Sequence, residues 1–430
     1  MRISSSIKGK KGIHLVLFFA IIFGYLQTIN ITVAQQQEQE GYSEYSGLVI
    51  DSKTKKPLEF ASIVVNNTNI STISNLDGKF ILKVPDSDLN KSVTISYLGY
   101  YNKVMKLNEF SSGILEVKMV ESFESLPNVR LVSGDPIFIL KKVMNNRARN
   151  YADQPLIMNA FYRESIKKRR KYASLSEAVV EIYKQPFHSI SKDQVKLFKS
   201  RKSTDYNKID TLVIKLQGGP YNNINMDMIK NKDLLFSEDF FDLYNFKLEK
   251  TINMDNKPVF VIDFVQKSSV VEPLFKGKLY IDVNSYALSK AVFSLNLENL
   301  KKASKYFVKK KPAKADVIPV HTKYIVDYVN NNGKWYYNYG RIELSFKIKW
   351  DKKLFNSLYH LIIEMAITDW KVNADHKNLK NKERLKQNVI INDRASGFSD
   401  PEFWGDYNVI EPDKSIENAI RKIKKQLDKK

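Results

Sequence analysis

The clearest pattern in this chain is an unbroken alternation of apolar and polar side chains over residues 341–350. Every second position is apolar: Ile342, Leu344, Phe346, Ile348 and Trp350. Because successive side chains of a strand point to opposite faces, this pattern predicts a strand of an antiparallel sheet with one buried and one water-facing side. The same alternation over residues 359–367 predicts a second strand of this kind.

Strand patterns fill most of the second half of the chain. Residues 160–164 and 173–183 predict the first long strands after Pro155, and residues 277–288 are typical of a strand, a turn and a strand. Residues 330–333 read Asn-Asn-Asn-Gly and predict a hairpin loop, because Asn and Gly tolerate the positive φ of tight turns. Together these patterns predict one large antiparallel sheet.

Shorter strands, divided by turn residues, occupy residues 45–120. Three groups of apolar residues alternate with their neighbours here: Ala61, Ile63 and Val65; Phe80, Leu82 and Val84; and Val93, Ile95 and Tyr97. Asp77-Gly78 is typical of a hairpin turn between two of these strands. Many short strands at this spacing predict a small β-sandwich.

Two segments have helical periodicity. Asp135 suits the cap of a helix and Pro136 its first turn, and Ile137, Leu140, Met144 and Ala148 would share its apolar face. Residues 413–430 predict a basic amphipathic helix, whose apolar positions are Ile416, Ala419, Ile420, Ile423 and Leu427. This last helix either packs on its own domain or lies on a membrane surface. Its narrow apolar stripe without aromatic residues favours packing on its own domain.

The first half of the chain carries a family resemblance. Residues 47–51, 75–80 and 97–100 form a spaced set that resembles the carboxypeptidase-regulatory-like domain over residues 45–120. The resemblance implies a seven-stranded, prealbumin-like (transthyretin-like) β-sandwich that is a non-catalytic accessory. Such domains precede outer-membrane receptors and parts of many secreted or periplasmic proteins. Ser71 is a departure, because many members of the family have Gly at this position of the turn.

The second half resembles known proteins more weakly. Residues 277–288 are similar to strands of the periplasmic lipoprotein-carrier group, in which a curved antiparallel sheet forms an open half-barrel over helices. The order of segments resembles a larger family of exported proteins, in which a regulatory-like domain precedes a β domain of unknown function. The expected fold is therefore mainly β: a seven-stranded sandwich, then a large antiparallel curved sheet or half-barrel with a few helices.

Residues 1–34 have the three parts of a secretory signal peptide. A basic start is followed by a mostly apolar run over residues 13–26 and by small residues before a cut after Ala34. The alternative is a retained membrane anchor, but the unbroken apolar run is shorter than the ~20 residues of a spanning helix. The chain has no cysteine, so it contains no disulfide and is not a lipoprotein anchored through an N-terminal Cys.

The formal net charge of the chain is +22, and the signal segment supplies four of the positive charges and no negative ones. Such a surface favours acidic partners such as lipopolysaccharide, phospholipid head groups or acidic glycans. The basic residues are spread along the chain, however, which favours a general richness in Lys over a single site. The densest group is Lys301, Lys302, Lys305, Lys309, Lys310, Lys311 and Lys314. Export argues against a nucleic-acid partner.

Patterns of catalytic or metal-binding residues are few. After the signal segment the histidines are His188, His321, His360 and His376, and none has the His-x-x-Glu or His-Glu-x-x-His spacing of zinc peptidases. His360 and Glu364 are four positions apart, but in a strand this spacing does not resemble a helical ligand pair. We interpret both as part of a solvated face. A Gly-x-Ser-x-Gly motif and a Gly-rich phosphate loop are absent from the sequence.

Two further clusters have two interpretations each. Glu238, Asp239 and Asp242 could do the acid–base work of a glycosidase, but a capped amphipathic helix explains them equally well. Trp335, Tyr336, Tyr337 and Tyr339 could stack on sugar rings or line a lipid-facing groove, but sheet packing is the favoured explanation. We therefore assign no catalytic, cofactor-binding or metal-binding residue, and the ligand-binding residues stay unknown.

The expected organisation has six segments: a signal peptide (1–34), a linker (35–44), the β-sandwich (45–120), a second linker (121–134), a helix plus antiparallel β domain (135–412) and a basic amphipathic helix (413–430). The expected function is that of a non-catalytic, exported envelope protein without a cofactor. It would bind an apolar ligand or a partner protein, such as an outer-membrane protein, a lipid or a glycan. The alternatives are an envelope hydrolase that uses carboxylates and a structural accessory of an outer-membrane assembly. The expected location is the periplasm or the periplasmic face of the outer membrane in a Gram-negative-type envelope.

Deletion of residues 415–430 tests the two interpretations of the C-terminal helix. If the helix packs on its own domain, the deletion lowers the melting temperature, because apolar side chains lose their contacts. Thermal unfolding measures this effect. Unchanged stability together with a loss of membrane association would contradict the prediction.

Overall fold

The computed structural model describes the chain from Gly41 to Leu427 with several gaps. The described residues are 41–110, 113–122, 134–169, 171–204, 218–234, 236–249, 251–254, 257–307, 315–351, 356–391 and 403–427. The predicted signal peptide (1–34), most of both predicted linkers and the predicted basic residues Lys309–Lys314 lie outside these ranges. The chain from Tyr42 onward belongs to one compact unit.

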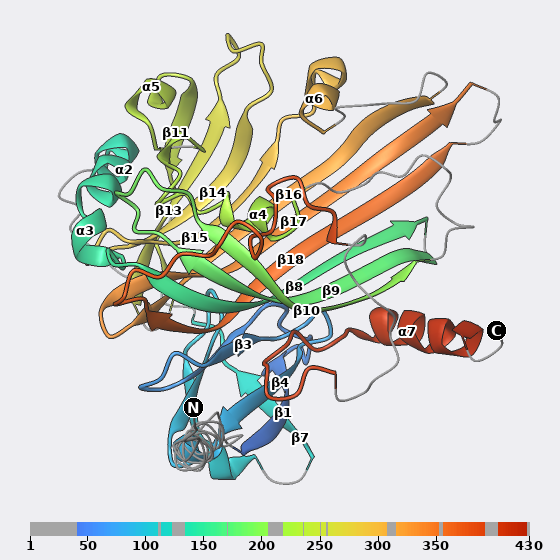
Figure 1. The fold of residues 1–430 in the computed structure, drawn as a ribbon. Coiled ribbons are helices and arrows are strands. Elements are labelled where there is room, and N and C mark those ends of the chain that lie inside the picture. Colours follow the sequence, from blue (N-terminus) through green and yellow to red (C-terminus); the bar gives the residue numbers. More distant parts are fainter. Residues whose placement is uncertain are drawn as a thin grey trace, which may run out of the picture. The chain divides into compact units, whose positions relative to one another are not determined.

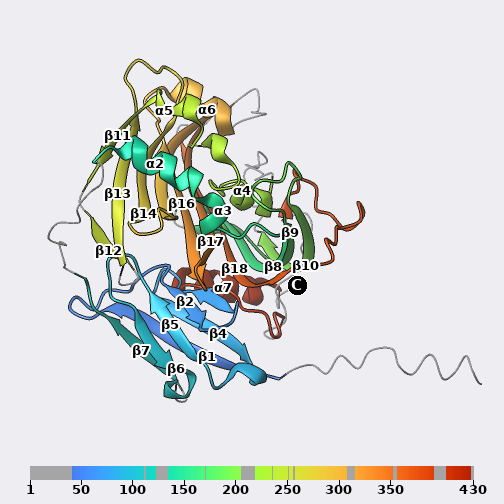
Figure 2. The same cartoon turned by 90° about the vertical axis from the view of Figure 1, so that its left-hand side faces the viewer.

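Seven strands form the predicted N-terminal sandwich (Figures 1 and 2). The three-stranded sheet has the order β4 (Lys79–Pro85), β1 (Tyr42–Asp51) and β7 (Ile114–Met119). The four-stranded sheet has the order β3 (Ser71–Ile73), β2 (Ser62–Val65), β5 (Ser92–Ser96) and β6 (Lys103–Lys106). Two short 3₁₀ helices are η1 (Asp86–Asp88) and η2 (Leu107–Glu109). The predicted alternating residues Ile63, Phe80, Leu82, Val93 and Ile95 are fully buried between the sheets, so the predicted sandwich is confirmed.

Two sequence predictions in this region are wrong in detail. The predicted linker over residues 35–44 extends too far, because Tyr42, Ser43 and Glu44 already pair with β4. Asp77-Gly78 forms a turn, with Gly78 at φ +76°, but this turn is not a hairpin. It joins β3 of one sheet to β4 of the other. A side chain at Gly78 would place its Cβ 2.5 Å from the carbonyl oxygen of Val49, so glycine fits this crossing.

The second half forms an eleven-stranded antiparallel sheet. Its continuous order is β10-β9-β8-β18-β17-β16-β15-β14-β13-β11, and β12 pairs with β13. The bounds are β8 (Leu156–Lys168), β9 (Lys171–Lys184), β10 (Gln194–Thr204), β11 (Tyr244–Leu248), β12 (Ile252–Met254), β13 (Lys257–Gln266), β14 (Phe275–Asp282), β15 (Leu288–Leu295), β16 (Ala315–Asn331), β17 (Lys334–Trp350) and β18 (Ser357–Val372). The predicted large curved sheet is therefore confirmed (Figure 1).

The turns of this sheet agree with the sequence. Asn332 and Gly333 both have positive φ, +51° and +83°, and they form the two-residue turn between β16 and β17. This is the backbone geometry that a tight hairpin requires. Asp282 ends β14 and accepts hydrogen bonds from the backbone of Asn284 and Ser285, which reverses the chain into β15.

Helices are few and short. Asp135 caps α2 (Pro136–Asn145) as predicted, because its carboxylate accepts a hydrogen bond from the Ile137 backbone at 2.9 Å. The buried residues of α2 are Ile139, Leu140 and Val143. The predicted apolar face therefore shares only Leu140 with the buried face. Asn146, at φ −91° and ψ 6°, separates α2 from α3 (Arg147–Asn150). The other helices are α4 (Pro220–Ile224), η3 (Lys232–Leu234), α5 (Glu238–Phe241), α6 (Leu300–Phe307) and α7 (Lys414–Leu427).

We call the two sides of the large sheet the inner face and the outer face. The inner face packs against α2, α4 and α5 in the main apolar core, which includes Leu140, Ile224 and Phe241. The predicted alternating residues Ile342, Leu344, Phe346 and Ile348 of β17 lie in this core, as do Tyr359, Leu361 and Ile363 of β18. Figure 2 shows α2 and α3 on this side and the sandwich on the other.

The outer face was predicted to be water-facing, and this prediction is wrong for its central part. Arg341, Ser345 and Glu364 are all less than 7% exposed. Five charged residues of alternating sign stand side by side across five neighbouring strands, and we call them the charge ladder: Arg341, Glu364, Arg163, Glu177 and Arg201. Each of these five strands therefore has a charged residue on its outer side that is compensated by oppositely charged neighbours and not by water.

Every neighbouring pair of the charge ladder is in contact. Arg341 Nη1 lies 2.9 Å from Glu364 Oε2, and Arg163 Nη1 lies 3.3 Å from Glu364 Oε1. Glu177 receives Arg163 Nε at 2.7 Å and Arg201 Nε at 2.8 Å. Burial by itself would lower the pKa of Arg163 and raise the pKa of Glu177. The opposite charges outweigh burial, so the pKa of Arg163 is raised and that of Glu177 is lowered.

Residues distant in sequence cover the charge ladder. The Phe60 ring lies 4.7 Å from the Arg341 guanidinium and stacks on Tyr339, whose hydroxyl donates a hydrogen bond to Glu364. Arg163 Nη2 donates to the carbonyl oxygen of Ile410 at 2.6 Å. Trp404 packs on Arg201 at 4.8 Å. The sandwich and the C-terminal segment therefore complete the same buried layer.

Side chains also join the sandwich to the large sheet. Ser71, the departure from the family noted above, donates through Oγ to the Ile367 carbonyl oxygen at 3.0 Å. Asn69 Nδ2 donates to the Trp370 carbonyl oxygen at 2.6 Å. At the edge strand β4, Asn408 bonds both the backbone N–H (2.7 Å) and the carbonyl oxygen (2.9 Å) of Lys83. These bonds tie three distant parts of the chain together.

The C-terminal helix begins as predicted and packs on its own domain. Asp413 caps α7, because its carboxylate accepts from the backbone N–H groups of Ser415 and Ile416. Ile416 is 4% exposed and packs with Leu175 of β9. The Lys414 backbone N–H donates to the Asp77 carboxylate of the sandwich at 2.7 Å. The side chains beyond Arg421 lie outside the described ones.

Within the described part of the chain, no helix combines the length and the apolar character that crossing a membrane demands.

Arg163→Met tests how strongly the charge ladder depends on its central member. The substitution leaves Glu177 and Glu364 buried with reduced compensation, which costs about 3–5 kcal/mol of unfolding free energy. Urea denaturation measures this change. The matched control is Lys118→Met, because Lys118 pairs with Glu116 at the surface, and such surface changes usually stay within about 0.5 kcal/mol. Equal effects of the two substitutions would contradict the prediction.

Candidate functional site

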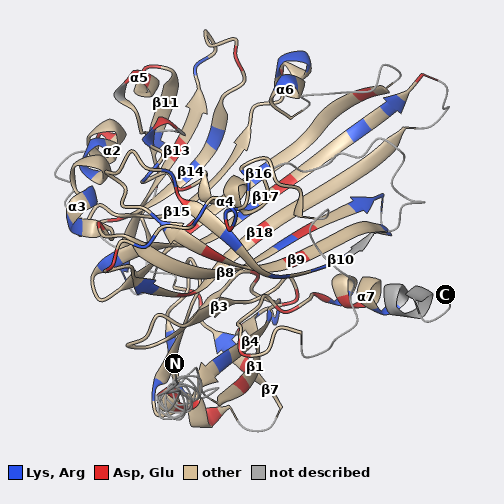
Figure 3. Cartoon of the chain, viewed as in Figure 1, with Lys and Arg blue, Asp and Glu red and all other residues tan. Residues whose placement is uncertain are grey.

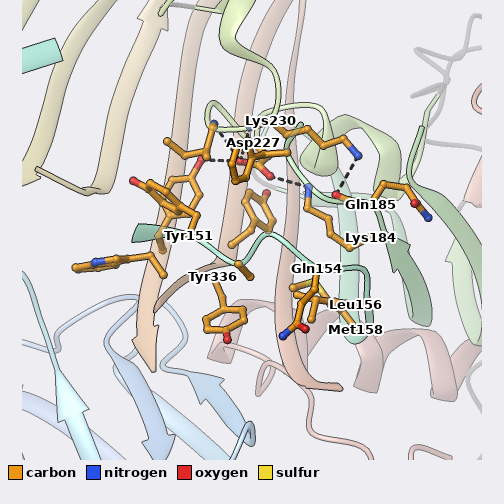
Figure 4. A pocket seen from close by; sticks show the side chains of 15 residues that line it. Tyr151, Gln154, Leu156, Met158, Lys184, Gln185, Asp227, Lys230 and Tyr336 are labelled. Atoms are coloured by element: carbon orange, nitrogen blue, oxygen red, sulfur yellow. Dashed lines mark hydrogen bonds and ion pairs between the residues drawn. The ribbon is translucent and has the colours of Figure 1, made fainter. Parts of the chain in front are cut away.

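One hollow of the structure lies on the inner face and is shown in Figure 4. We call it the inner pocket. Tyr151, Leu156, Met158, Lys184 and Tyr336 are among its lining residues. The chain starts β8 directly after Pro155, and the hairpin of β16 and β17 brings the aromatic residues beside it. The volume of the inner pocket is about 40 Å³. This is room for a few water molecules, whereas ligand pockets usually measure roughly 300–1,000 Å³.

Charged residues form one wall of the inner pocket. Lys184 Nζ, at the end of β9, lies 3.0 Å from Asp193 Oδ2 and 2.6 Å from Asp227 Oδ2. Lys230 also forms an ion pair with Asp193. Burial opposes the charge of Lys184, but the two carboxylates outweigh it and raise the pKa of Lys184. Burial is likewise outweighed at Asp193, where Lys184 and Lys230 lower the pKa of the carboxyl group.

These charged residues hold local backbone in place. Asp193 Oδ1 accepts from the Gln185 backbone N–H at 2.7 Å, which closes the loop between β9 and β10. Asp227 Oδ1 accepts from the Ile229 backbone N–H at 3.1 Å and from the Tyr328 hydroxyl at 2.9 Å. Each carboxylate therefore has its charge and its hydrogen bonds satisfied within the chain. The arrangement is that of a structural cluster rather than of a general base that awaits a substrate.

Several tyrosines also line the inner pocket. Tyr151, Tyr328 and Tyr337 are buried, and burial raises the pKa of each phenol well above its ordinary value. The Tyr151 hydroxyl donates to the Leu288 carbonyl oxygen at 2.9 Å, and the Tyr337 hydroxyl donates to the Asn223 carbonyl oxygen at 2.8 Å. These phenols therefore stay neutral and serve as hydrogen-bond donors.

The second hollow lies on the outer face, beyond the part of the charge ladder that the sandwich covers. We call it the outer groove, and its volume is about 630 Å³. Its lining includes Lys167 and Arg169 from β8 and its turn, Val320 and His321 from β16, Glu343 and Ser345 from β17, and Leu358, His360 and Ile362 from β18. Exposed apolar side chains are part of it, because Val320 is 45% and Leu358 is 36% exposed.

Strand pairing explains the arrangement of polar side chains in the outer groove. His321 pairs with Ser345, Ser345 with His360, and His360 with Lys167. Residues paired in this way share one face, so these four side chains form a row across β16, β17, β18 and β8. The hydrogen bond between Ser345 Oγ and His360 Nδ1, at 2.8 Å, confirms the shared face.

The outer groove is basic. Lys167 and Arg169 belong to it, and the carboxylate of Glu343 is already held by Arg341 Nε at 2.7 Å. Burial, followed by the charge of Lys167, lowers the pKa of His360. Burial also lowers the pKa of Lys167, against the opposing effect of Asp413. An anion placed in the groove would therefore favour the charged form of Lys167 and offset the cost of its burial.

The structure separates most of the residues that the sequence singled out. His188 and His376 are exposed, and His321 and His360 stand in the outer groove. Glu364 was predicted to lie on a solvated face, and this prediction is wrong, because Glu364 is buried in the charge ladder. Among the described residues there is no group of three or more His, Asp or Glu that could hold a metal ion.

The two ambiguous clusters fall differently. Asp239 and Asp242 are exposed at the single-turn helix α5, and the side chain of Glu238 lies outside the described ones. Trp335, Tyr337 and Tyr339 are buried, and Tyr336 packs on Trp370 with ring centroids 4.7 Å apart. Sheet packing, the favoured interpretation of these aromatics, is confirmed.

The general charge of the chain is spread as expected. Figure 3 shows Lys and Arg on both the sandwich and the large sheet. Sequence reasoning missed the inner charged cluster and the outer groove, because their members come from strands and loops far apart in the chain. Arg163 and Glu177, charged residues within predicted strands, were signals of the charge ladder alone.

Comparison with known protein families identifies a family for one part of the chain. Residues 45–129 match the CarboxypepD_reg-like domain family, which confirms the predicted resemblance. A search of curated proteins found no match.

Solved structures resemble the chain only distantly. One is a domain from Vibrio parahaemolyticus described as outer membrane lipoprotein-sorting, with 14% identity, a TM-score of 0.25, and coverage of 56% of this chain and 94% of that one. Another is a DUF1329 family protein from Desulfovibrio piger, with 10% identity, a TM-score of 0.23, and coverage of 57% and 96%. A third is MucB in complex with MucA, with 9% identity, a TM-score of 0.18, and coverage of 56% and 100%. Likeness at this level carries no functional argument.

Lys184, Asp193, Asp227 and Lys230 form the inner charged cluster. Asp193→Asn tests its structural role. The pKa of Asp193 is lowered in the folded chain, so its charge stabilises the fold above its ordinary pKa of 3.8 and this contribution is lost as the pH falls below that value. We expect the substitution to lower the melting temperature at pH 6 and to have a smaller effect at pH 2.5.

The matched control is Asp375→Asn, because Asp375 pairs with Lys377 at the surface. Thermal unfolding at both pH values compares the two variants. A deficit of Asp193→Asn that is equal at pH 6 and pH 2.5 would show that its carboxylate charge is not what stabilises the fold.

Proposed function

We propose that this chain is a non-catalytic binding protein of the cell envelope and that the outer groove is its binding surface. The observation that carries the proposal is the contrast between the two faces of the large sheet. The core of the inner face is packed with the chain's own aromatic and apolar side chains, and the inner pocket among them measures about 40 Å³. The outer face has a groove of about 630 Å³ with exposed apolar residues and basic residues at its edge.

The sequence supports a location in the cell envelope. Residues 1–34 have the composition of a secretory signal peptide, and residues 45–129 match a domain family whose description is regulatory-like. Both support export and an accessory role. We place the protein in the periplasm or on the periplasmic face of the outer membrane.

The charged residues support binding rather than catalysis. Asp227 of the inner pocket and Asp193 beside it are held in ion pairs with Lys184 and Lys230. Asp239 and Asp242, the candidates for a hydrolase, are exposed at a short helix. Neither arrangement provides the enclosed pair of carboxyl groups that glycoside hydrolysis uses.

The role of the sandwich differs from a free docking module. Its described contacts with Ile367, Trp370 and Asn408 belong to its own chain. We propose that it fixes the outer face of the large sheet, so that the groove beside it keeps its shape.

Site-specific cross-linking tests the proposal. A photoreactive benzoylphenylalanine is placed at Leu358 in the outer groove of the full chain, and illumination is done in cells of the native host. We expect a cross-linked adduct, because the groove is occupied in the envelope. The matched control carries the same group at Val271, which is 65% exposed outside the groove.

The result also distinguishes the two kinds of ligand. An adduct of protein size identifies a partner protein, and a lipid-sized mass increase of the purified chain identifies an apolar ligand. Adducts that are equally abundant at Leu358 and Val271, or absent at both, would overturn the proposed binding surface.

A further inference from the structure

We propose that the outer groove binds an extended, acidic segment of a partner protein, in which Asp or Glu alternate with aliphatic residues. This inference rests on the proposed function, because it names the partner class of the same groove. It comes from the charge, the spacing and the openness of the groove, each of which restricts the ligand.

Charge is the first restriction. Lys167 and Arg169 are the cations of the groove, and they stand at one end of the row of polar side chains. The carboxylate of the groove, Glu343, is already neutralised by Arg341 at 2.7 Å. Incoming carboxylates would therefore meet cations rather than like charge, and each charge-assisted hydrogen bond is among the stronger ones that proteins form.

Spacing is the second restriction. The row from His321 to Lys167 crosses four adjacent strands. Neighbouring strands lie about 4.8 Å apart, so the row spans roughly 14 Å, which an extended chain covers with about four or five residues. Leu358 and Ile362 flank this row on the same face, because they are two positions before and after His360. A segment bound along the row would thus meet basic groups at its β8 end and aliphatic side chains on either side of β18.

Openness is the third restriction and separates a peptide from a lipid. A small-molecule site typically buries 70–90% of its ligand, whereas the outer groove is open toward solvent along strands whose exposed residues include Val320 and His321. An acyl chain would remain wet on one side. A peptide carries its own polar backbone, which can stay solvated while its side chains contact the groove.

The binding mode differs from addition of a strand. The four strands under the groove already pair with one another, so their backbone N–H and C=O groups are used. The segment would lie across the strands and be recognised through side chains. Its affinity is therefore mainly electrostatic and decreases as salt screens the charges.

A direct binding experiment tests the inference. The probe is a fluorescent eight-residue peptide of alternating Asp and Leu, added to the purified chain that starts after Ala34, and anisotropy is recorded at 50 and 500 mM NaCl. We expect binding that weakens at least tenfold at the higher salt concentration. A matched peptide with Lys in place of Asp should not bind.

Two charge reversals place the site. Arg169→Glu, at an exposed turn of the groove, should weaken binding of the acidic peptide at least tenfold. Lys371→Glu, at an exposed position of β18 outside the groove lining, makes the same change of net charge and should weaken binding less than twofold. Thermal unfolding of both variants confirms that they are folded.

Other outcomes overturn the inference. Equal binding of the Lys peptide, or equal effects of the two reversals, would show that the groove does not select acidic segments. Binding of phosphatidylglycerol vesicles that is lost in Arg169→Glu, without binding of the acidic peptide, would assign the groove to a membrane surface. If cross-linking at Leu358 succeeds and the peptide fails, only the partner class is wrong; if both fail, the groove is not a binding surface.

Discussion

The structure depends on a single row of alternating charge across five strands. Arg341, Glu364, Arg163, Glu177 and Arg201 form ion pairs with one another under the sandwich and the C-terminal segment. A shift of any strand by one residue would move its charged side chain to the inner, apolar face. Such a displaced charge would be both unpaired and desolvated, which is far more costly than the native arrangement. The charge ladder therefore fixes the register of β17, β18, β8, β9 and β10 together, and it also fixes the surface on which the sandwich rests.

Local patterns predicted the elements well because the alternation of strands is written in consecutive residues. The strands around Ile342 and Leu361 and the cap at Asp135 follow from such patterns. The solvent state of the polar face could not be predicted in this way. Arg341 and Glu364 look like solvated residues when each strand is read alone, but Phe60 packs on Arg341 and the Tyr339 hydroxyl donates to Glu364. The turn at Gly78 shows the same limit, since its sequence specifies a turn but not that the next strand belongs to another sheet.

The candidate site was hidden for a related reason. His321, Ser345, His360 and Lys167 come from strands that neighbour one another only in the order β16-β17-β18-β8. Lys167 precedes His360 by almost two hundred positions in the sequence, and strand pairing alone brings the two together. The residue types in the groove are ordinary, so neither a motif nor a spacing in the sequence marks it. The aromatic cluster near Trp335 had a denser signal but serves as packing, which shows that local density and function need not coincide.

The side chain of Asn408 has a consequence for how the chain matures. Its amide imitates a neighbouring strand by bonding both backbone groups of Lys83, so it shields an edge that could otherwise pair with another molecule. The two residues are separated by 325 positions. Because synthesis proceeds from the N-terminus, the sandwich is made first, and this edge of β4 stays bare until Asn408 follows. A complete chain whose C-terminal segment has not yet packed is thus most prone to pair with other molecules along β4.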